Sequence, residues 1–312
     1  MDVSIIMINY NTFELTKAAI ESIFSYTKGL NYEIILIDNA SPDGSGEKLR
    51  EIFADRIKYI GNSENLGTSK AFNQGLIISE GKYILWLNTD ILLFDNFIKK
   101  LYDFMEENED CGVCGGNLLN AEKKPSHSYR KKILSVKTLK QDMCITRWVL
   151  RKVFKRIISD NYNYSKKPKE VGLIIGADMF VRKAVFDEIG GLDEDIFMYC
   201  EETEFQFRVK KRTKYKIMSV PWAKMIHLEG RSFEGNFNVR RHRYSTIGTA
   251  IYIKKSYGEK QSKEYLNMLK SSYKKFIRVC KFFQLNGKKE MYMSKLKNVN
   301  DIQSEFPTVK YF

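Results

Sequence analysis

Two carboxylates stand directly after apolar segments of the chain, where they have no obvious packing role. Asp90 ends the stretch LWLNTD, with Asn88 two residues before it, and Asp38 ends EIILID. A buried strand gains nothing from ending on a carboxylate, because removing a charge from water is costly. Carboxylate and amide oxygens bind divalent cations and hydroxyl groups, so these residues predict a site for a polar ligand.

The elements that position these residues alternate between two periodicities. Short apolar runs predict strands, and the amphipathic segments between them predict helices, the first opened by a capping box of Asn11 and Glu14. The predicted strands are Val3–Ile8, Glu33–Asp38, Ile57–Gly61, Tyr83–Asn88 and Gly112–Gly116, and the predicted helices end near Tyr26, Ser79 and Asn108. This alternation is typical of an α/β fold with a mostly parallel central sheet flanked by helices.

Polar side chains follow four of these strands in succession. They are Asn9 and Asn11, Asp38 and Asn39, Asn62 and Asn65, and Asn88 and Asp90. In open α/β sheets the ligand site lies beyond the carboxyl ends of the strands, so these residues are expected to share one edge. Asn and Asp also cap helices and make turns, and this structural role is the alternative for each of them.

The positive charge of the chain is unevenly distributed. Residues 1–122 carry 10 Lys/Arg and 19 Asp/Glu, and residues 170–239 carry 10 and 12. Residues 123–169 carry 15 Lys/Arg and 2 Asp/Glu, and residues 240–312 carry 17 and 5, so the excess lies in an internal insert and a C-terminal region. Both segments are predicted to be mainly helical, with no clear strand in the insert.

Several classes of protein are excluded by composition. A hydrophobic content of 43% is enough for a full core, and no apolar run is long enough for a membrane span. The N-terminus lacks the features of a signal peptide, so we expect a cytoplasmic protein with reduced cysteines. Cys111 and Cys114 have CxxC spacing, but no second pair completes a zinc site, and core packing is the expected role.

Seven motifs resemble, in order, those of the family-2 inverting glycosyltransferases, most closely the rhamnosyltransferase-like branch that builds bacterial surface polysaccharides. The motifs are NYN (9–11), IDNASPDGS (37–45), ENLGTSKAFNQG (64–75), LNTD (87–90), GADMFVRK (176–183), GGLDEDIFMYCEETEF (190–205) and HLEGRS (227–232). The basic C-terminal region is not covered by the resemblance.

The resemblance implies a GT-A fold and a division of the chain. Residues 1–239 would form the glycosyltransferase domain, and residues 240–312 a basic helical C-terminal region. Within the domain, residues 1–118 would bind the nucleotide sugar, 119–170 would be the basic insert, and 171–239 would bind the acceptor.

The implied reaction transfers a sugar from a nucleoside diphosphate donor, dTDP-rhamnose or a UDP-sugar, to a hydroxyl of a growing glycan, with inversion. A divalent cation, Mn²⁺ or Mg²⁺, neutralises the leaving diphosphate. Asp90 matches the family's metal ligand, and His227 matches a histidine that approaches the metal or the diphosphate. Asn88 replaces a more usual aspartate, and a neutral amide is a weaker ligand, so we expect it to bind the ribose or a metal-bound water.

Inversion also requires a base opposite the leaving group, since a hydroxyl is a poor nucleophile until its proton is removed. The family places an acidic pair at a helix N-terminus, which here is Glu201 and Glu202. Glu202 is the expected base and Glu201 its neighbour toward the acceptor, while Glu204 is a third carboxylate that could reach the hydroxyl. Asp178 matches residues near the donor sugar or acceptor. Stabilisation of the helix N-terminus by these acids is the alternative.

The resemblance assigns ten residues to the nucleotide-sugar donor. They are Asn9, Tyr10, Asp38, Asn65, Gly67, Lys70, Asn73, Asn88, Arg231 and Ser232. Among them, Asp38 would contact the base or ribose, Gly67 would allow the backbone to approach the ligand, and Arg231 would bind phosphate oxygens.

The C-terminal region mixes cations with aromatic residues, as in YKKFIRVCKFF (273–283). This pattern favours an interfacial helix on an anionic membrane, which would bring the enzyme to a lipid-linked acceptor on the inner face of the plasma membrane. Dimerisation, a solvated surface, and nucleic-acid binding as the least favoured partner are the alternatives.

Two other functions compete with glycosyl transfer. An NAD(P) oxidoreductase would share the alternating strands and helices, but the first turn, INYNTFEL, lacks the GxGxxG fingerprint. A non-catalytic carbohydrate- or nucleic-acid-binding protein would explain the basic surface but not the carboxylates after strands.

Overall fold

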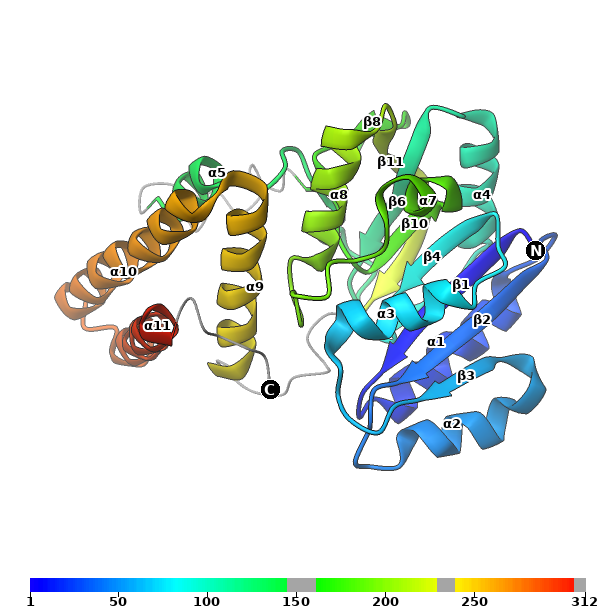
Figure 1. The fold of residues 1–312 in the computed structure, drawn as a ribbon, viewed down its shortest axis with the longest axis horizontal. Coiled ribbons are helices and arrows are strands. Elements are labelled where there is room, and N and C mark those ends of the chain that lie inside the picture. Colours follow the sequence, from blue (N-terminus) through cyan, green and yellow to red (C-terminus); the bar gives the residue numbers. More distant parts are fainter. Residues whose placement is uncertain (145–160, 229–238, 306–312) are drawn as a thin grey trace. The chain divides into compact units, whose positions relative to one another are not determined.

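In the computed structural model, residues 1–144, 161–228 and 239–305 are described. Within these ranges the chain forms two compact units. The first comprises residues 1–133, 161–194 and 202–228, and the second comprises residues 134–144, 195–201 and 239–305. Figure 1 shows the elements of both.

The first unit is built on a nine-stranded sheet with the order β3-β2-β1-β4-β10-β6-β11-β5, with β8 paired to β11. The parallel strands are β1 (Val3–Asn9), β2 (Tyr32–Asp38), β3 (Lys58–Gly61), β4 (Tyr83–Leu87), β6 (Cys111–Leu119) and β11 (Lys216–His227). Three strands run antiparallel to their neighbours: β5 (Ile91–Leu92), β8 (Lys169–Glu170) and β10 (Asp178–Arg182). The predicted α/β class with a mostly parallel central sheet is confirmed.

Alternation along the strands divides the core between the two faces of the sheet. Ile5 and Met7 of β1 pack on one face, and Ile6 packs on the other. The same alternation in β4 separates Leu85 and Leu87 from Ile84 and Trp86, because successive side chains of a strand point to opposite faces.

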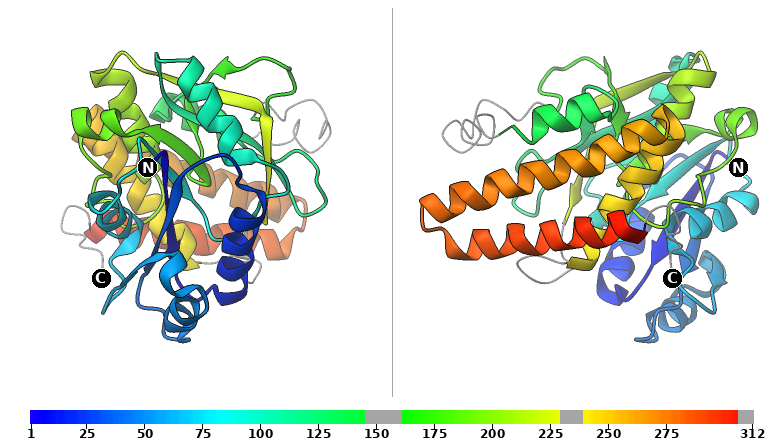
Figure 2. Two further views of the ribbon diagram at one scale, coloured as in Figure 1. Left: turned by 90° about the vertical axis from the view of Figure 1, so that its right-hand side faces the viewer. Right: turned by 60° about the vertical axis from the view of Figure 1, so that its left-hand side comes forward.

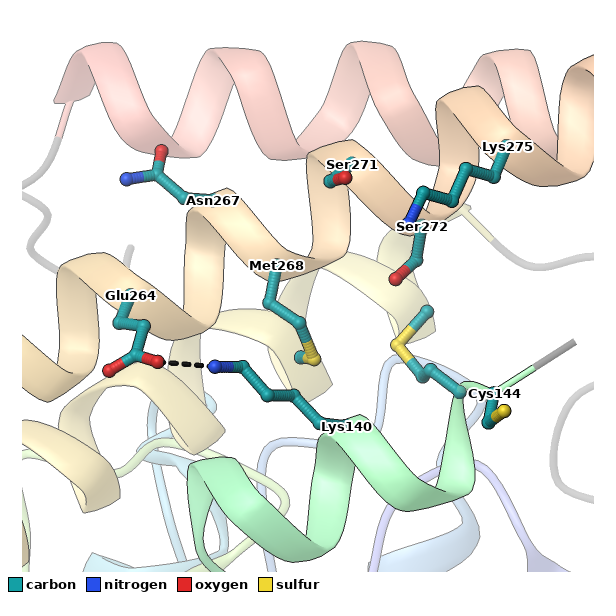
Figure 3. Close-up of a pocket in the computed structure, with 9 residues that line it drawn as sticks. Lys140, Cys144, Glu264, Asn267, Met268, Ser271, Ser272 and Lys275 are labelled. Carbon is teal, nitrogen blue, oxygen red and sulfur yellow. Dashed lines mark hydrogen bonds and ion pairs between the residues drawn. The ribbon is translucent and has the colours of Figure 1, made fainter.

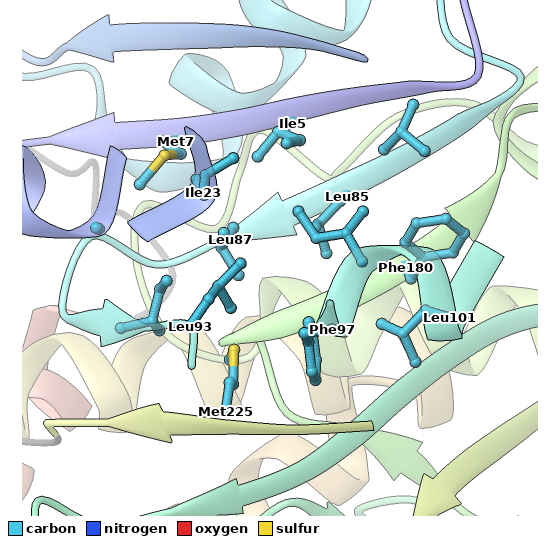
Figure 4. Packing of buried hydrophobic residues seen from close by; sticks show 14 of the residues in the cluster. Ile5, Met7, Ile23, Leu85, Leu87, Leu93, Phe97, Leu101, Phe180 and Met225 are labelled. Carbon is cyan, nitrogen blue, oxygen red and sulfur yellow. The ribbon is translucent and has the colours of Figure 1, made fainter. Parts of the chain in front are cut away.

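Helices cover both of these faces. The first face is covered by α1 (Phe13–Tyr26), α2 (Ser45–Phe53) and α4 (Phe97–Glu107), part of whose packing is shown in Figure 4. The second face is covered by α3 (Gly67–Ile77), α7 (Lys183–Ile189) and α8 (Glu201–Arg212). A short 3₁₀ helix, η1 (Ala54–Arg56), follows α2.

Two local predictions were wrong. The N-cap of α1 is Thr12 and makes no side-chain capping bond, while Asn11 has a φ of 55°, so the capping box does not form. The insert contains a strand, β7 (Tyr129–Arg130), which pairs with β9 (Leu173–Ile174) in a second, two-stranded sheet. The segment after the insert forms two strands, β9 and β10, separated by a turn at Gly176.

The second unit consists of α5 (Val136–Asp142), α9 (Val239–Tyr257), α10 (Glu259–Phe282) and α11 (Asn286–Glu305). Figure 2 shows α10 and α11 lying side by side and antiparallel, joined by a short turn. Their contact includes stacked rings of Phe276 and Tyr292, 4.8 Å apart. His242 of α9 bonds both helices, through Tyr273 Oη at 2.9 Å and Asn298 Nδ2 at 2.8 Å.

No helix among the described residues is both long and apolar enough to cross a membrane.

Candidate functional site

Asp90 and His227, the two predicted metal ligands, lie in contact. The Nε2 atom of His227 is 3.2 Å from Oδ1 of Asp90, and both side chains are about nine-tenths buried. The two-residue strand β5 explains the contact, since it begins immediately after Asp90 and pairs Ile91 with His227. The backbone N–H of Leu228 also donates to the carbonyl of Asp90 at 2.8 Å.

Asp178 lies at the adjoining end of β10. It is opposite Leu87 in the sheet. The N–H of Asn88 donates to the carbonyl of Ala177, the residue before Asp178. The side chain of Asp178 is fully buried, and its Oδ2 accepts a bond from the Gly116 N–H at 2.6 Å. Burial raises the pKa of this carboxyl to about 7, against the opposing effects of the Gly116 bond and of His227.

Among the described residues, Oδ1 of Asp178 has no hydrogen-bond partner in the protein. A buried polar atom without a partner costs free energy, and native structures keep few of them. Oδ1 of Asp178 is therefore available to a ligand atom near the carboxyl end of β4 and the amino end of β10.

Glu202 lies against the same end of the sheet. A side chain added at Gly176 would meet the Glu202 Cβ at 3.6 Å and the ring of Trp86 at 3.5 Å, so the glutamate packs beside the turn before β10. Its Oε1 accepts a bond from Thr203 Oγ1 at 2.9 Å. Burial raises the pKa of Glu202, and the Thr203 bond and the charge of Arg130 oppose that rise.

The backbone before α8 is strained. Tyr199 and Cys200 have φ values of 68° and 75°, and Glu201 begins the helix directly after them. Left-handed conformations of residues other than glycine cost on the order of 1 kcal/mol each and concentrate at functional sites. Glu201 itself is buried.

Asn9 and Asp38 form the polar centre at the ends of β1 and β2. The Asn9 amide donates to Asp38 Oδ1 at 2.6 Å and to Ser45 Oγ at 2.8 Å, and its oxygen accepts from Thr12 and Thr16. Asn9 is fully buried, Asp38 is 6% exposed and Tyr10 is 42% exposed. Asp38 is therefore held by Asn9 and by two further bonds, from the N–H and the hydroxyl of Ser41, while Tyr10 keeps surface accessible to a ligand.

The loop before α3 is ordered by its own asparagines. Asn65 Oδ1 accepts from Asn39 Nδ2 at 2.9 Å and from the Gly67 N–H at 3.0 Å. Gly67 has a φ of 79°, which a glycine adopts without strain, and Lys70 on the first turn of α3 is exposed.

Two other predicted residues have internal partners. Asn73 donates to the carbonyl of Leu192 and to Glu194, so it fixes the loop after α7. Glu204 accepts two bonds from Arg208 Nε, each of 2.9 Å, and this buried pair anchors the same loop through Gly191. Arg231 and Ser232 lie outside the described residues.

Sequence reasoning missed Arg130. It belongs to β7, and its charge acts on Glu202. In the sequence it stands in the run SYRKK, where nothing distinguishes it from the neighbouring cations, and only the pairing of β7 with β9 sets it apart.

The described residues contain no group of three or more His, Cys, Asp and Glu side chains arranged to hold a metal. A divalent cation in this region would therefore rest on Asp90 and His227, with its other positions open to oxygen atoms of a ligand. In the second unit, a groove of 640 Å³ lies between α5 and α10, and the residues that line it include the Lys140–Glu264 ion pair (Figure 3). None of the predicted site residues lines it.

Comparison with known proteins adds independent information. Residues 4–190 match the model of glycosyl transferase family 2, a range that includes Asp38, Asp90 and Asp178 but ends before Glu202 and His227. The chain is 26% identical over 190 residues to glycosyltransferase GlyG of Streptococcus pneumoniae, covering 60% of this chain and 58% of GlyG. It is 37% identical over 245 residues to an uncharacterized glycosyltransferase of Rickettsia bellii, and the match covers 77% of this chain and 31% of that relative.

A third relative is the low-salt glycan biosynthesis hexosyltransferase Agl10 of Haloferax volcanii, 27% identical over 214 residues, with coverage of 67% of this chain and 62% of Agl10. The chain thus spans less than two thirds of the length of each of these three relatives. The family match extends over more than half of the chain and includes the strand ends that carry Asn9, Asp38 and Asp90. The chain belongs to glycosyltransferase family 2.

Proposed function

We propose that this protein is an inverting glycosyltransferase that moves a sugar from a nucleoside diphosphate donor to a hydroxyl of a glycan. The observation that carries the proposal is the contact between Asp90 and His227 at 3.2 Å, beside Asn88. Residues 1–118 supply the donor half and residues 171–239 the acceptor half in this proposal. The relatives named for glycosyl transfer and glycan biosynthesis support the reaction class.

The residues present fit a divalent cation. Two ligands that are adjacent in an octahedral shell of about 2.1 Å radius lie about 3 Å apart, close to the separation of Asp90 Oδ1 and His227 Nε2. One carboxylate oxygen and one imidazole nitrogen suit Mn²⁺, and Mg²⁺ accepts the carboxylate more readily than the imidazole. When bound, the cation would neutralise negative charge on the leaving diphosphate.

At the donor end, Asp38 would accept hydrogen bonds from the ribose or base, held in place by the buried Asn9 amide. Tyr10 is exposed beside it and offers a ring for contact with the base. Asn88 would bind the ribose or a water on the cation. The donors we propose are dTDP-rhamnose and UDP-sugars.

At the acceptor end, Glu202 would take the proton of the attacking hydroxyl on Oε2, while Oε1 holds the Thr203 hydroxyl. Burial increases the proton affinity of this carboxylate, which improves a base that works near neutral pH. Asp178, with its buried carboxyl, would orient a hydroxyl of the donor sugar or of the acceptor. Arg130 would stabilise the ionised form of Glu202 before the reaction.

We also propose that the protein works at an anionic membrane surface, where a lipid-linked acceptor resides. Support comes from the turn between α10 and α11, where Phe282 is 80% and Phe283 is 64% exposed. From Lys270 to Lys297 the chain carries nine Lys/Arg and only one acidic residue, Glu290. Exposed aromatic rings surrounded by cations are typical of an interfacial anchor, and a second copy of this surface would be repelled by its charge.

The deciding experiment is a thermal-shift panel of UDP, dTDP, GDP and CMP, each with and without Mn²⁺. A metal-dependent rise of Tm with UDP or dTDP would support the reaction and identify the nucleobase. Stabilisation by glycans but by no nucleotide would favour a carbohydrate-binding protein instead, and no shift with any nucleotide would overturn the enzyme proposal.

A further inference from the structure

We infer that α9 holds the strained backbone that begins α8, and that Gly248 and Thr249 are positioning residues for the acidic pair. The inference rests on the proposed function of Glu202 as the base. Both segments concerned, residues 195–201 and helix α9, belong to the second unit. The C-terminal helices would then contribute to catalysis itself, in addition to any role at a membrane.

The backbone to be held is that of Tyr199 and Cys200, two successive non-glycine residues with positive φ. Such conformations persist only where the surroundings impose them, because each residue would relax to negative φ if it were free to do so. A change of φ at Cys200 would redirect the first turn of α8, since Glu201 is the next residue and Glu202 follows in the same helix.

Gly248 is the residue of α9 that lies against the backbone of Met198 and Tyr199. A Cβ atom at this position would lie 2.1 Å from the carbonyl oxygen of Tyr199 and 2.9 Å from that of Met198. These obstacles are backbone atoms, which cannot rotate away as the end of a side chain can. Glycine is disfavoured in the interior of a helix such as α9, so its presence here is explained by the close approach that it permits.

Side chains of α9 contact the same segment on both sides of Gly248. Thr249 Oγ1 is 3.1 Å from Cys200 Sγ, and since the threonine donates to the Ser245 carbonyl, the thiol is the donor of that contact. The ring of Tyr244 lies 5.1 Å from that of Phe197.

Two cationic side chains of α9 also contact this segment. The Arg241 guanidinium lies 5.8 Å from the Tyr199 ring, and Lys255 pairs with Asp195. Positions 241, 244, 248 and 255 are spaced by three, four and seven residues, so they share one face of the helix. This face contacts the segment from Asp195 to Tyr199, and Gly248, which meets the carbonyl of Tyr199, lies near its centre.

The test compares Gly248→Ala with Gly287→Ala, a control in α11 where an added Cβ meets nothing within 4 Å. The substrate probe is the donor that wild-type protein cleaves fastest among dTDP-rhamnose, UDP-galactofuranose, UDP-glucose and UDP-N-acetylglucosamine. Three measurements are made on each variant. Nucleoside diphosphate release gives kcat and KM, a binding titration gives Kd for UDP or dTDP with Mn²⁺, and amide hydrogen exchange is followed for residues 196–203.

We expect Gly248→Ala to lower kcat by roughly 10- to 100-fold, because small displacements of a reacting group have effects of this size. KM for the donor and the nucleotide Kd should stay within about twofold, and exchange of the amides of residues 199–203 should accelerate. Gly287→Ala should match wild type in all three measurements.

A second pair of variants tests the inference in case Gly248→Ala does not fold. Thr249→Val removes the acceptor of the Cys200 thiol and should lower kcat. Thr249→Ser keeps the hydroxyl, so its kcat should equal that of the wild type. The inference is overturned if folded Gly248→Ala keeps the wild-type kcat and exchange pattern, or if kcat and nucleotide affinity fall together. If Glu202→Gln keeps the wild-type rate, the assignment of the base fails instead, and accelerated exchange in Gly248→Ala still reports on the α9 contact.

Discussion

Asp90 and His227 come from opposite halves of the chain, yet their side chains lie 3.2 Å apart because β5 and the end of β11 pair at Ile91 and His227. The carboxylate is placed by a two-residue strand, and the imidazole by the last residue of a twelve-residue strand. This contact defines the cation site of the proposed mechanism, and it is the first relationship to test.

Replacing Asp90 by Ala should abolish the Mn²⁺-dependent part of the thermal shift with UDP or dTDP. It should also lower the transfer rate by about 100-fold or more, because removing one group that stabilises developing charge has effects of that size. Circular dichroism should be unchanged. Asp187→Ala, at an exposed position of α7, is the matched control. If the Asp90→Ala variant still shows the Mn²⁺-dependent thermal shift, Asp90 is not a ligand of the metal.

Replacing Glu202 by Gln should lower the rate by about 100-fold or more, the usual contribution of a general base. Because burial raises the pKa of Glu202, the rate of the wild-type enzyme should fall on the acid side at a pH above the ordinary glutamate value of 4.5. The base must be ionised, so the loss occurs as pH decreases through that raised pKa.

Glu204→Gln is the comparison for Glu202. Its carboxylate binds Arg208, so this substitution should lower Tm while the acid side of the pH profile stays where it is. The assignment would be reversed if Glu204→Gln moved the pH profile and Glu202→Gln did not.

Asp178 should make stability depend on pH. Its folded-state pKa of about 7 lies above the ordinary aspartate value of 3.8, so between these values the folded protein binds more protons than the unfolded chain. The free energy of unfolding should therefore decrease as pH rises from about 4 to 7, by a contribution on the order of 4 kcal/mol. Urea titrations in EDTA measure this slope, and it should be flatter in Asp178→Asn. An equal slope in both proteins would contradict the raised pKa.

Phe282 and Phe283 should insert into anionic membranes. The double substitution of both residues by Ser should weaken binding to vesicles containing phosphatidylserine by about tenfold or more, since each exposed ring gains about 1.5 to 3 kcal/mol when it leaves water. Tyr26→Ser, at an aromatic residue that ends α1 and is 42% exposed, is the control. Flotation should fail for wild type on neutral vesicles, and tighter binding to single-stranded RNA than to vesicles would favour a nucleic-acid partner.

Much of the fold could be predicted from the sequence because strands and helices of the first unit carry regular hydrophobic patterns. The runs that end at Asp38 and Leu87 are continuous and apolar, which is typical of buried parallel strands. Short elements gave no such signal. Strands β5 and β7 have two residues each and owe their existence to the partners that pair with them, β11 and β9.

The placement of candidate site residues was predictable where a motif and a strand end coincide, as at Asp38 and Asp90. It was not predictable where the environment depends on contacts across the chain. Asn9 was expected to face the donor, but its amide is buried and bonded to Asp38 and Ser45. The effect of Arg130 on Glu202 and the strain at Tyr199 and Cys200 arise from tertiary structure, which no local pattern encodes.

The pairing of β5 with β11 also has a consequence for biosynthesis of the protein. The ribosome synthesises the segment with Asp90 long before the one with His227, so the nascent chain has half of the proposed cation site until the end of β11 is made. Until then, Ile91 and Leu92 lack their strand partner, and the carboxylate lacks the imidazole. Affinity for metal and nucleotide should thus arise only in the last stage of folding, which makes ligand binding a reporter of a completed sheet.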